Sequence, residues 1–305
     1  MIRHDPALDR LIAPDARLET LASGFTWSEG PVWIADGGYL LFSDVPENRI
    51  HRWSEKDGVS VFMEPSGYDG PDASVFREPG SNGLIAAPRG SILMADHGAR
   101  AIARVDLATR AKTLLATRYG DARFSSPNDL VQASNGAIFF TDPPYGLKEM
   151  DRSPLKETAY NGVYRLDPDG VVTLLDDSLS FPNGIGLSPD QRTLYVAVSD
   201  PERPLLLAYD LTRTGPAMKP RVLMDFSDQV GPSNPGLPDG MAVDRAGHLF
   251  ATGPGGVHVL TPEGRSLGRI DTGGAAANCT FGEDGRSLFI TAGDRLLRLR
   301  TLTLG

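Results

Sequence analysis

A short pattern that recurs six times constrains this 305-residue chain more than any other feature. Each copy begins with an acidic or amide residue and an apolar run, continues through a tight polar turn, and ends with a second apolar run. The six opening residues, which lie 39 to 56 positions apart, are Glu29, Asn82, Asn128, Asn183, Asp239 and Asn278. Strand-like repeats of about 40–50 residues are typical of a β-propeller, in which each repeat forms one four-stranded blade. The pattern therefore predicts an all-β, six-bladed β-propeller.

The two ends of the chain complement one another. Residues 17–23 resemble an isolated strand that no hairpin follows, whereas the last repeat ends after three strands. We therefore expect the N-terminal strand to close the last blade, which would leave no open sheet edge between the ends. This interpretation assigns residues 17–305 to a single propeller domain that carries the activity. It leaves residues 1–16 as an N-terminal surface arm with at most one short helix.

The composition narrows the class of partner. The formal net charge is −9 and no lysine or arginine cluster is present, which argues against nucleic acid or an anionic membrane surface. No apolar run reaches the length of a membrane span, and the first residues contain no apolar signal core. The single cysteine, Cys279, excludes an internal disulfide. We expect a cytoplasmic protein that is a monomer or a weak homodimer. Glycine-rich nucleotide motifs and a serine-hydrolase elbow are also absent.

The six opening residues are predicted to face the central channel together, as a ring of oxygen donors. Oxygen ligands suit calcium first and magnesium or manganese second, whereas zinc prefers His and Cys. Only Glu29 and Asp239 in the ring are charged, so they would just neutralise a divalent cation. Such a cation could polarise a carbonyl or phosphoryl oxygen. The alternative interpretation is that the Asn-Gly and Asp-Gly pairs are only turns that introduce strands.

Loop lengths predict which face of the disc carries the function. Three long segments, residues 64–81, 145–161 and 227–238, fall on the face where the ring residues lie. Binding elements concentrate in long loops on a rigid scaffold. Asp44 and Asp142 end second strands, and we expect them to hold the mouth loops by accepting backbone hydrogen bonds.

Several residues are candidates for the chemistry at this face. Asp239 is the first candidate for a general base or nucleophile, although metal ligation would lower its basicity. His97 could transfer protons and Tyr145 could donate a hydrogen bond to substrate. The alternatives are that His97 is a hydrogen-bonded loop residue and that Tyr145 packs on prolines. Glu149 is a further substrate-binding candidate, because residues 148–160 are rich in charge, which favours a polyol.

The sequence closely resembles the gluconolactonase branch of the SMP-30/gluconolactonase/regucalcin-like family. The similarity runs from about residue 20 to the C-terminus in unbroken order. The stretches that carry it are Ser28-Glu-Gly-Pro-Val-Trp, Ser126-Pro-Asn-Asp-Leu-Val, Thr141-Asp-Pro-Pro-Tyr-Gly, Gly162-Val-Tyr-Arg-Leu-Asp, Pro182-Asn-Gly-Ile-Gly-Leu-Ser-Pro-Asp and Pro238-Asp-Gly-Met-Ala-Val-Asp.

This resemblance implies a catalytic divalent metal, commonly calcium, and hydrolysis of aldonolactones such as glucono-1,5-lactone to the aldonic acid. By motif match it implies that the metal ligands are Glu29, Asn128, Asn183 and Asp239, and that Asp239 is the acid/base residue. The resemblance does not include Asn82 and Asn278 among the ligands, so these two residues are candidates to support the metal ligands or to contact the substrate.

One departure affects the substrate. Animal members of the family carry an arginine where this chain has Ser126, so the sugar contacts of those relatives cannot be transferred. Two alternatives to a sugar lactonase therefore stay open. One is a metal-dependent esterase or phosphotriesterase acting on non-sugar substrates, and the other is a non-enzymatic calcium-binding propeller. An apolar lid would favour the esterase, and a mouth filled by its own loops would favour the binding protein.

Overall fold

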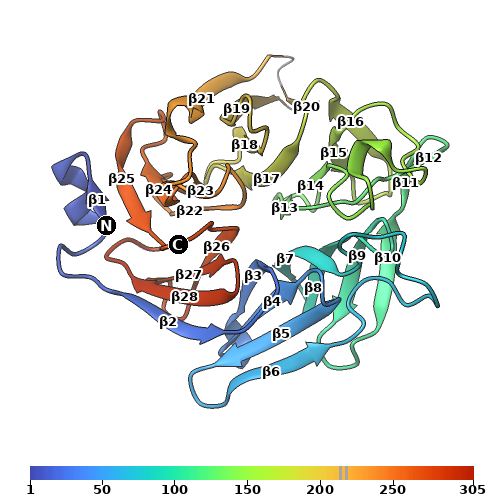
Figure 1. The fold of residues 1–305 in the computed structure, drawn as a ribbon, viewed down its shortest axis with the longest axis horizontal. Helices are drawn as coiled ribbons and strands as arrows, with labels where there is room; N and C mark the ends of the chain where they lie inside the picture. The colour runs from blue at the N-terminus through green and yellow to red at the C-terminus, as the bar shows by residue number, and fades with distance from the viewer. Residues whose placement is uncertain (213–214, 217–218) are drawn as a thin grey trace.

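The computed structural model describes residues 1–212, 215–216 and 219–305 and contains six blades arranged around a central channel (Figure 1). In each blade four antiparallel strands follow one another outward from the channel, and two blades gain an additional short strand. This arrangement confirms the predicted six-bladed propeller.

The blades are built from short strands of similar length. The first three blades are β3 (Ser28–Ile34), β4 (Tyr39–Asp44), β5 (Arg49–Ser54) and β6 (Gly58–Met63); β7 (Ser81–Ala87), β8 (Ser91–Asp96), β9 (Ala101–Asp106) and β10 (Lys112–Ala116); and β13 (Leu130–Gln132), β14 (Ile138–Asp142), β15 (Gly162–Leu166) and β16 (Val172–Asp176). The other three are β17 (Pro182–Leu187), β18 (Thr193–Val198), β19 (Leu205–Thr212) and β21 (Arg221–Asp225); β22 (Met241–Val243), β23 (Leu249–Gly253), β24 (Gly256–Leu260) and β25 (Ser266–Asp271); and β26 (Asn278–Gly282), β27 (Ser287–Ala292), β28 (Arg295–Arg300) and β2 (Leu18–Ser23).

The remaining elements are short. They are the strands β1 (Ile2–Arg3), β11 (Arg118–Tyr119), β12 (Ala122–Arg123) and β20 (Gly215–Pro216), and the 3₁₀ turns η1 (Pro6–Arg10), η2 (Ala35–Gly37), η3 (Met150–Arg152) and η4 (Ser227–Gln229). Within the described ranges, no helix combines the length and the apolar character needed to cross a membrane.

The N-terminal strand closes the last blade, as predicted. β2 pairs antiparallel with β28, with Leu18 opposite Leu299 and Thr20 opposite Leu297. The strand that comes first in the sequence is therefore the outermost strand of the blade that comes last. This pairing joins the two ends of the chain and covers the outer edge of β28.

The core consists of apolar layers between neighbouring blades. In the described part of the chain, buried apolar side chains form six clusters, one at each blade interface. Alternate residues of a strand serve different interfaces: Leu40 and Phe42 of β4 pack toward Phe289 of the last blade, whereas Leu41 packs toward the second blade. Side chains alternate between the two faces of a strand, so each blade contributes to two layers. The cluster between the last blade and the first completes the ring.

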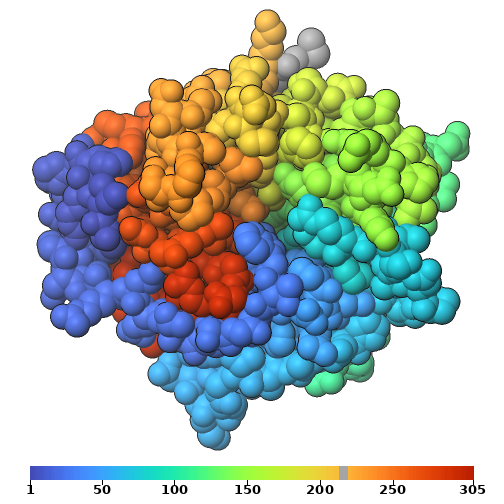
Figure 2. Space-filling view, in the orientation of Figure 1, coloured from blue at the N-terminus to red at the C-terminus, as the bar shows by residue number. Residues whose placement is uncertain are grey.

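The N-terminal arm packs more tightly than a surface segment would. β1 adds a fifth strand beside β25, and Leu8 and Ile12 are fully buried in the cluster between the fifth and sixth blades. Figure 2 shows this blue segment lying against the orange and red segments of those blades. The arm is thus part of the hydrophobic core.

This packing predicts that Leu8→Ala lowers the free energy of unfolding by about 2–4 kcal/mol, because the substitution leaves a cavity in a closed apolar layer. Leu114→Ala is the matched control, because Leu114 lies on an outer strand and is 46% exposed; it should cost about 0.5 kcal/mol or less. Urea unfolding followed by tryptophan fluorescence measures both. Equal stability of the two variants would mean that the arm is dispensable for the core.

Candidate active site

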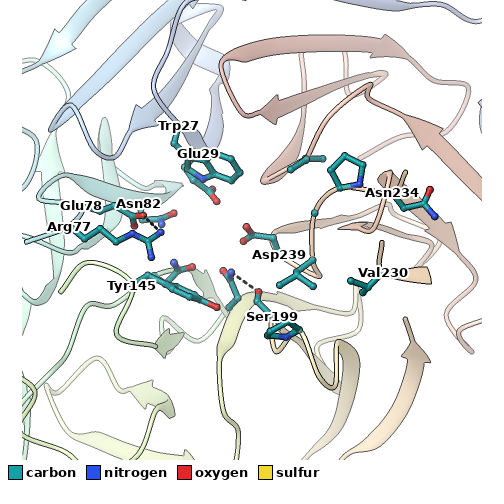
Figure 3. Close-up of a pocket in the computed structure, with 18 of the residues that line it drawn as sticks. Trp27, Glu29, Arg77, Glu78, Asn82, Tyr145, Ser199, Val230, Asn234 and Asp239 are labelled. Atoms are coloured by element: carbon teal, nitrogen blue, oxygen red, sulfur yellow. Dashed lines mark hydrogen bonds and ion pairs between the residues drawn. The ribbon is translucent and has the colours of Figure 1, made fainter. Parts of the chain in front are cut away.

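A cavity of about 550 Å³ opens at one end of the channel, and most of the predicted ring residues line it. Five of the six ring residues line it, namely Glu29, Asn82, Asn128, Asn183 and Asp239. All four residues that the resemblance assigns to a metal are among these five. Asn278 instead lines a second cavity, of about 390 Å³, farther along the channel. Figure 3 shows Glu29 and Asp239 pointing into the same central space.

Five of the six ring residues lie where the inner strands pair irregularly or begin, whereas Asn278 pairs regularly with Thr291. The register of β3 with β4 shifts between Glu29 and Val32, and β7 and β17 shift at the equivalent position. Asn128 and Asp239 precede the first paired residues of β13 and β22. Bulges and strand ends release a side chain from the regular alternation. The ring side chains can therefore turn toward the channel.

The glycines that follow the ring residues allow the inner strands to approach one another. A Cβ atom on Gly30 would overlap the carbonyl oxygen of Asn82, and one on Gly184 would overlap that of Asp239. Gly30 and Gly184 both lie within strands. These glycines are therefore close-packing sites between blades, and the alternative interpretation as turns does not apply to them.

Hydroxyl groups on the second strands fix the backbone of the ring. Ser43 Oγ donates to the carbonyl oxygen of Asn82 at 2.8 Å, and Thr141 Oγ1 donates to that of Asn183 at 2.6 Å. Each hydroxyl belongs to the blade that precedes the ring residue it holds. The position of one ring residue thus depends on the neighbouring blade.

The predicted loop anchors are confirmed. The carboxylate of Asp44 accepts hydrogen bonds from the backbone N–H groups of Thr26 and Trp27, both at 3.0 Å. The carboxylate of Asp142 accepts from the corresponding groups of Ser125 and Ser126, both at 2.8 Å. These bonds hold the segments that lead into Glu29 and Asn128.

The orientation of the Asn183 amide follows from its hydrogen bond. Its Nδ2 donates to Ser199 Oγ at 2.9 Å, and Ser199 Oγ donates to the carbonyl oxygen of Pro238, the residue before Asp239. Because the nitrogen is used in this way, Oδ1 is buried without a hydrogen-bond partner. Asn82 Oδ1 is likewise buried and unpartnered. Two amide oxygens are therefore available to a ligand of the cavity.

Carboxylates crowd this end of the channel. Burial raises the pKa of Glu29 to about 8, and the charge of Asp129 adds to the shift, while a hydrogen bond from Gly30 N opposes it. Burial raises the pKa of Asp239 well above its usual range, and Glu29, Asp129 and Glu78 each raise it further. Without a counter-charge, the ionised forms of these groups repel one another. The site therefore favours a cation.

The donor set suits a hard divalent cation. Glu29 and Asp239 supply two carboxylates, and Asn82 and Asn183 supply unpartnered amide oxygens. Within the part of the chain that the structure describes, no cluster of three His, Cys, Asp or Glu side chains is placed to hold a metal. A cation bound here would consequently depend on amide oxygens as well as on the two carboxylates.

Tyr145 lies in the wall of the cavity, as its assignment as a substrate-binding residue requires. Its ring stacks on Phe181 with 5.9 Å between the ring centroids. Burial raises the pKa of Tyr145, and a hydrogen bond with Ser199 opposes the shift. The hydroxyl therefore stays protonated near neutral pH and can donate a hydrogen bond.

The structure does not bring His97 and Glu149 into the cavity. His97 is fully buried, with its Nδ1 3.6 Å from Glu78 Oε2, and burial lowers its pKa to about 3. Its imidazole is therefore neutral and does not contact the cavity. Glu149 is exposed and precedes η3. The charged segment 148–160 contributes no lining residue, and the wall is formed instead by part of residues 230–237.

The sequence analysis did not single out four polar residues that line the two cavities of the channel: Arg77, Glu78, Asp129 and Ser199. A signal existed for two of them. In four other repeats the ring residue is followed by glycine, but Asn128 is followed by Asp129, and this exception could have marked it. Ser199 comes directly after the second strand of its repeat, near the position that Asp44 occupies at the end of the second strand of the first repeat. Arg77 and Glu78 lie in a long loop without repeat symmetry, so no pattern marked them.

Comparison with known proteins agrees with this architecture. A model of the SMP-30/gluconolactonase/LRE-like region matches residues 27–294. Gluconolactonase of Zymomonas mobilis is 45% identical over 99% of this chain and 86% of that protein, and pentonolactonase XacC of Haloferax volcanii is 29% identical over 86% and 80%. The solved structure of a gluconolactonase from Xanthomonas campestris is 36% identical, with a TM-score of 0.83 over 98% of this chain and 94% of that one. The chain described here belongs to the SMP-30/gluconolactonase/LRE-like family.

Proposed function

We propose that this protein hydrolyses sugar lactones, such as an aldono-1,5-lactone, to the corresponding aldonic acid in the cavity at the channel mouth. The observation that carries the proposal is the convergence of Glu29, Asp239 and the unpartnered oxygen of Asn183 on one open cavity. The names of the relatives, a gluconolactonase and a pentonolactonase, support the same substrate class.

We propose that one divalent cation, calcium first, is held by Glu29, Asn128, Asn183 and Asp239. Two carboxylates would neutralise its charge, and the amide oxygens would complete an all-oxygen ligand set. When bound, the cation would supply Lewis-acid polarisation of the lactone carbonyl.

Asp239 is the proposed general base. It would take a proton from the water that adds to the carbonyl carbon, and it would return a proton to the ring oxygen when the carbon–oxygen bond breaks. A carboxylate beside a cation normally loses basicity. The charges of Glu78 and Asp129 act in the opposite direction, because both raise the pKa of Asp239. Tyr145 would donate a hydrogen bond to a substrate oxygen in the same cavity.

A second candidate function has one observation in its favour. The wall that residues 230–237 contribute includes the apolar side chains of Val230, Pro235 and Leu237. Such a wall also suits a non-sugar ester. Competition between glucono-1,5-lactone and an aryl ester, measured as the ratio of their kcat/KM values, distinguishes the two substrate classes. The open cavity gives less support to a binding protein whose mouth is filled by its own loops.

The role of Asp239 predicts that Asp239→Asn lowers kcat for glucono-1,5-lactone by about 10²- to 10⁴-fold, because the amide cannot accept the proton. Proton release in weak buffer, corrected for spontaneous hydrolysis, measures the rate. The exposed residue Asp36 provides the control variant Asp36→Asn, which should retain wild-type turnover. Near-full activity of Asp239→Asn would remove this residue from the mechanism.

The cation proposal predicts that chelation abolishes turnover and that added calcium restores it. Glu29→Gln should weaken calcium binding, measured by titration calorimetry, by about 100-fold, since one of two charged ligands is lost. Glu55→Gln is the matched control, because Glu55 is 73% exposed at the surface. Unchanged calcium affinity in Glu29→Gln, or full activity after chelation, would contradict the proposed site.

Calcium affinity should also depend on pH. Burial raises the pKa of Glu29 to about 8 in the cation-free chain, so this group is largely protonated below that pH. Binding needs the ionised form, and the pKa of Asp239 is raised as well. Calcium affinity should therefore fall as the pH drops below 8, by up to about tenfold per pH unit for each carboxyl group that must release its proton. Calorimetry at pH 6 and 8.5 in buffers of different ionisation enthalpy would detect the released proton. Equal affinities without proton release would mean that both carboxylates are already ionised.

A further inference from the structure

The cavity has two unlike walls. On one side lie Arg77, Glu78 and Tyr145, and on the other lies Val230 (Figure 3). Leu237 and Pro235, from the same segment as Val230, also line the cavity. Among the described residues that line the cavity, Arg77 carries the only positive charge. The proposed hydrolysis does not use this charge.

Arg77 and Glu78 form a fixed pair at the mouth. Arg77 Nη2 donates to Glu78 Oε1 at 2.6 Å, and the Arg77 side chain is 52% exposed, whereas that of Glu78 is 12% exposed. The backbone N–H groups of both residues donate to the carbonyl oxygen of Gly146, at 2.9 and 3.3 Å. The pair is therefore held against the segment that carries Tyr145.

Most donors of the Arg77 guanidinium remain available. Besides Glu78, the guanidinium contacts the thioether sulfur of Met150, which lies 3.4 Å from Nη1 and is a weak acceptor. A guanidinium has five N–H donors in a planar fork, so it can bind two neighbouring oxygens at once. Glu78 beside it can accept hydrogen bonds from hydroxyl groups.

Ser126, where the animal members have arginine, has a different task. It is fully buried; its Oγ donates to the carbonyl oxygen of Pro143 at 2.6 Å and accepts from Gly146 N at 2.9 Å. It therefore faces no substrate. Instead it fastens the same Gly146 that holds Arg77 and Glu78.

These two walls match the two kinds of surface on a polyhydroxylated ring. Its hydroxyl-bearing edge needs donors and acceptors, and its C–H face needs an apolar surface. We propose that Arg77 and Glu78 bind hydroxyl groups of the lactone away from its carbonyl, while the wall of Val230 and Leu237 contacts its C–H face. The pair thereby sets the preference for polyhydroxylated over unsubstituted lactones. This inference rests on the proposed lactonase function.

The test compares glucono-1,5-lactone with δ-valerolactone, which has the same six-membered ring without hydroxyl groups. Arg77→Met keeps the length of the side chain and removes the donors. It should lower the ratio of kcat/KM for glucono-1,5-lactone to that for δ-valerolactone by about 10- to 100-fold, as expected for lost hydrogen bonds to a charged group. Most of the change should appear in KM for the sugar lactone. Glu78→Gln should lower the same ratio, and Arg77→Lys should restore part of it.

Arg52→Met is the matched control, because Arg52 pairs with Asp57 at 3.3 Å near the β5–β6 hairpin and does not line the cavity. For Arg52→Met, the ratio of kcat/KM for glucono-1,5-lactone to that for δ-valerolactone should equal the wild-type ratio. An unchanged ratio in Arg77→Met, or equal losses with both lactones, would overturn the inference while leaving the lactonase proposal intact. A wild-type protein that accelerates neither lactone would overturn both. If Arg77→Met fails to fold, Arg77→Lys and Glu78→Gln report the same ratio.

Discussion

The close approach of the six inner strands at the channel is the constraint on which the rest of the site depends. Gly30 and Gly184 have no room for a side chain, because the carbonyl groups of Asn82 and Asp239 in the next blades occupy that space. Hydroxyl groups such as Ser43 Oγ then bind these backbones across the blade interface. The ring residues are therefore positioned by their neighbours in space, and the geometry of each depends on closure of the whole propeller.

The close approach of the strands also brings several carboxylates near one another, so that their ionised forms repel. Glu29 and Asp239 face the same cavity, while Glu78 and Asp129 add their charges from the mouth and from within the channel. Buried carboxylates so near one another cannot all remain ionised without a counter-charge. In the function proposed above, a divalent cation would relieve this repulsion, and the carboxylates outside its ligand set would help to keep Asp239 basic. One arrangement of charge would then serve both cation binding and proton transfer.

The fold could be predicted almost completely, because the number and length of the repeats indicate how many blades the propeller has. Each copy gave two strands and a turn, and the missing fourth strand after Arg295–Arg300 required a partner from the N-terminus, which β2 provides. The sequence was less informative about residues 1–16. Leu8, Leu11 and Ile12 lie in a segment of mixed polar and apolar residues, and their burial depends on packing between two blades that no local pattern describes.

The sequence by itself determined which oxygen donors surround the channel, because the repeat places equivalent residues at equivalent positions. The loop anchor Asp142 could be predicted in the same way, from its position at the end of a second strand. Only the tertiary structure decided what surrounds them. The sequence places His97 just after a second strand, at the end that faces the cavity, yet its side chain is buried next to Glu78. Arg77, in contrast, lines the cavity from a loop that contains no motif. The physical reason is that repeat symmetry governs the strands. Loop segments are positioned by contacts with other loops, such as the backbone hydrogen bonds from Arg77 and Glu78 to Gly146, and these contacts exist only in the folded protein.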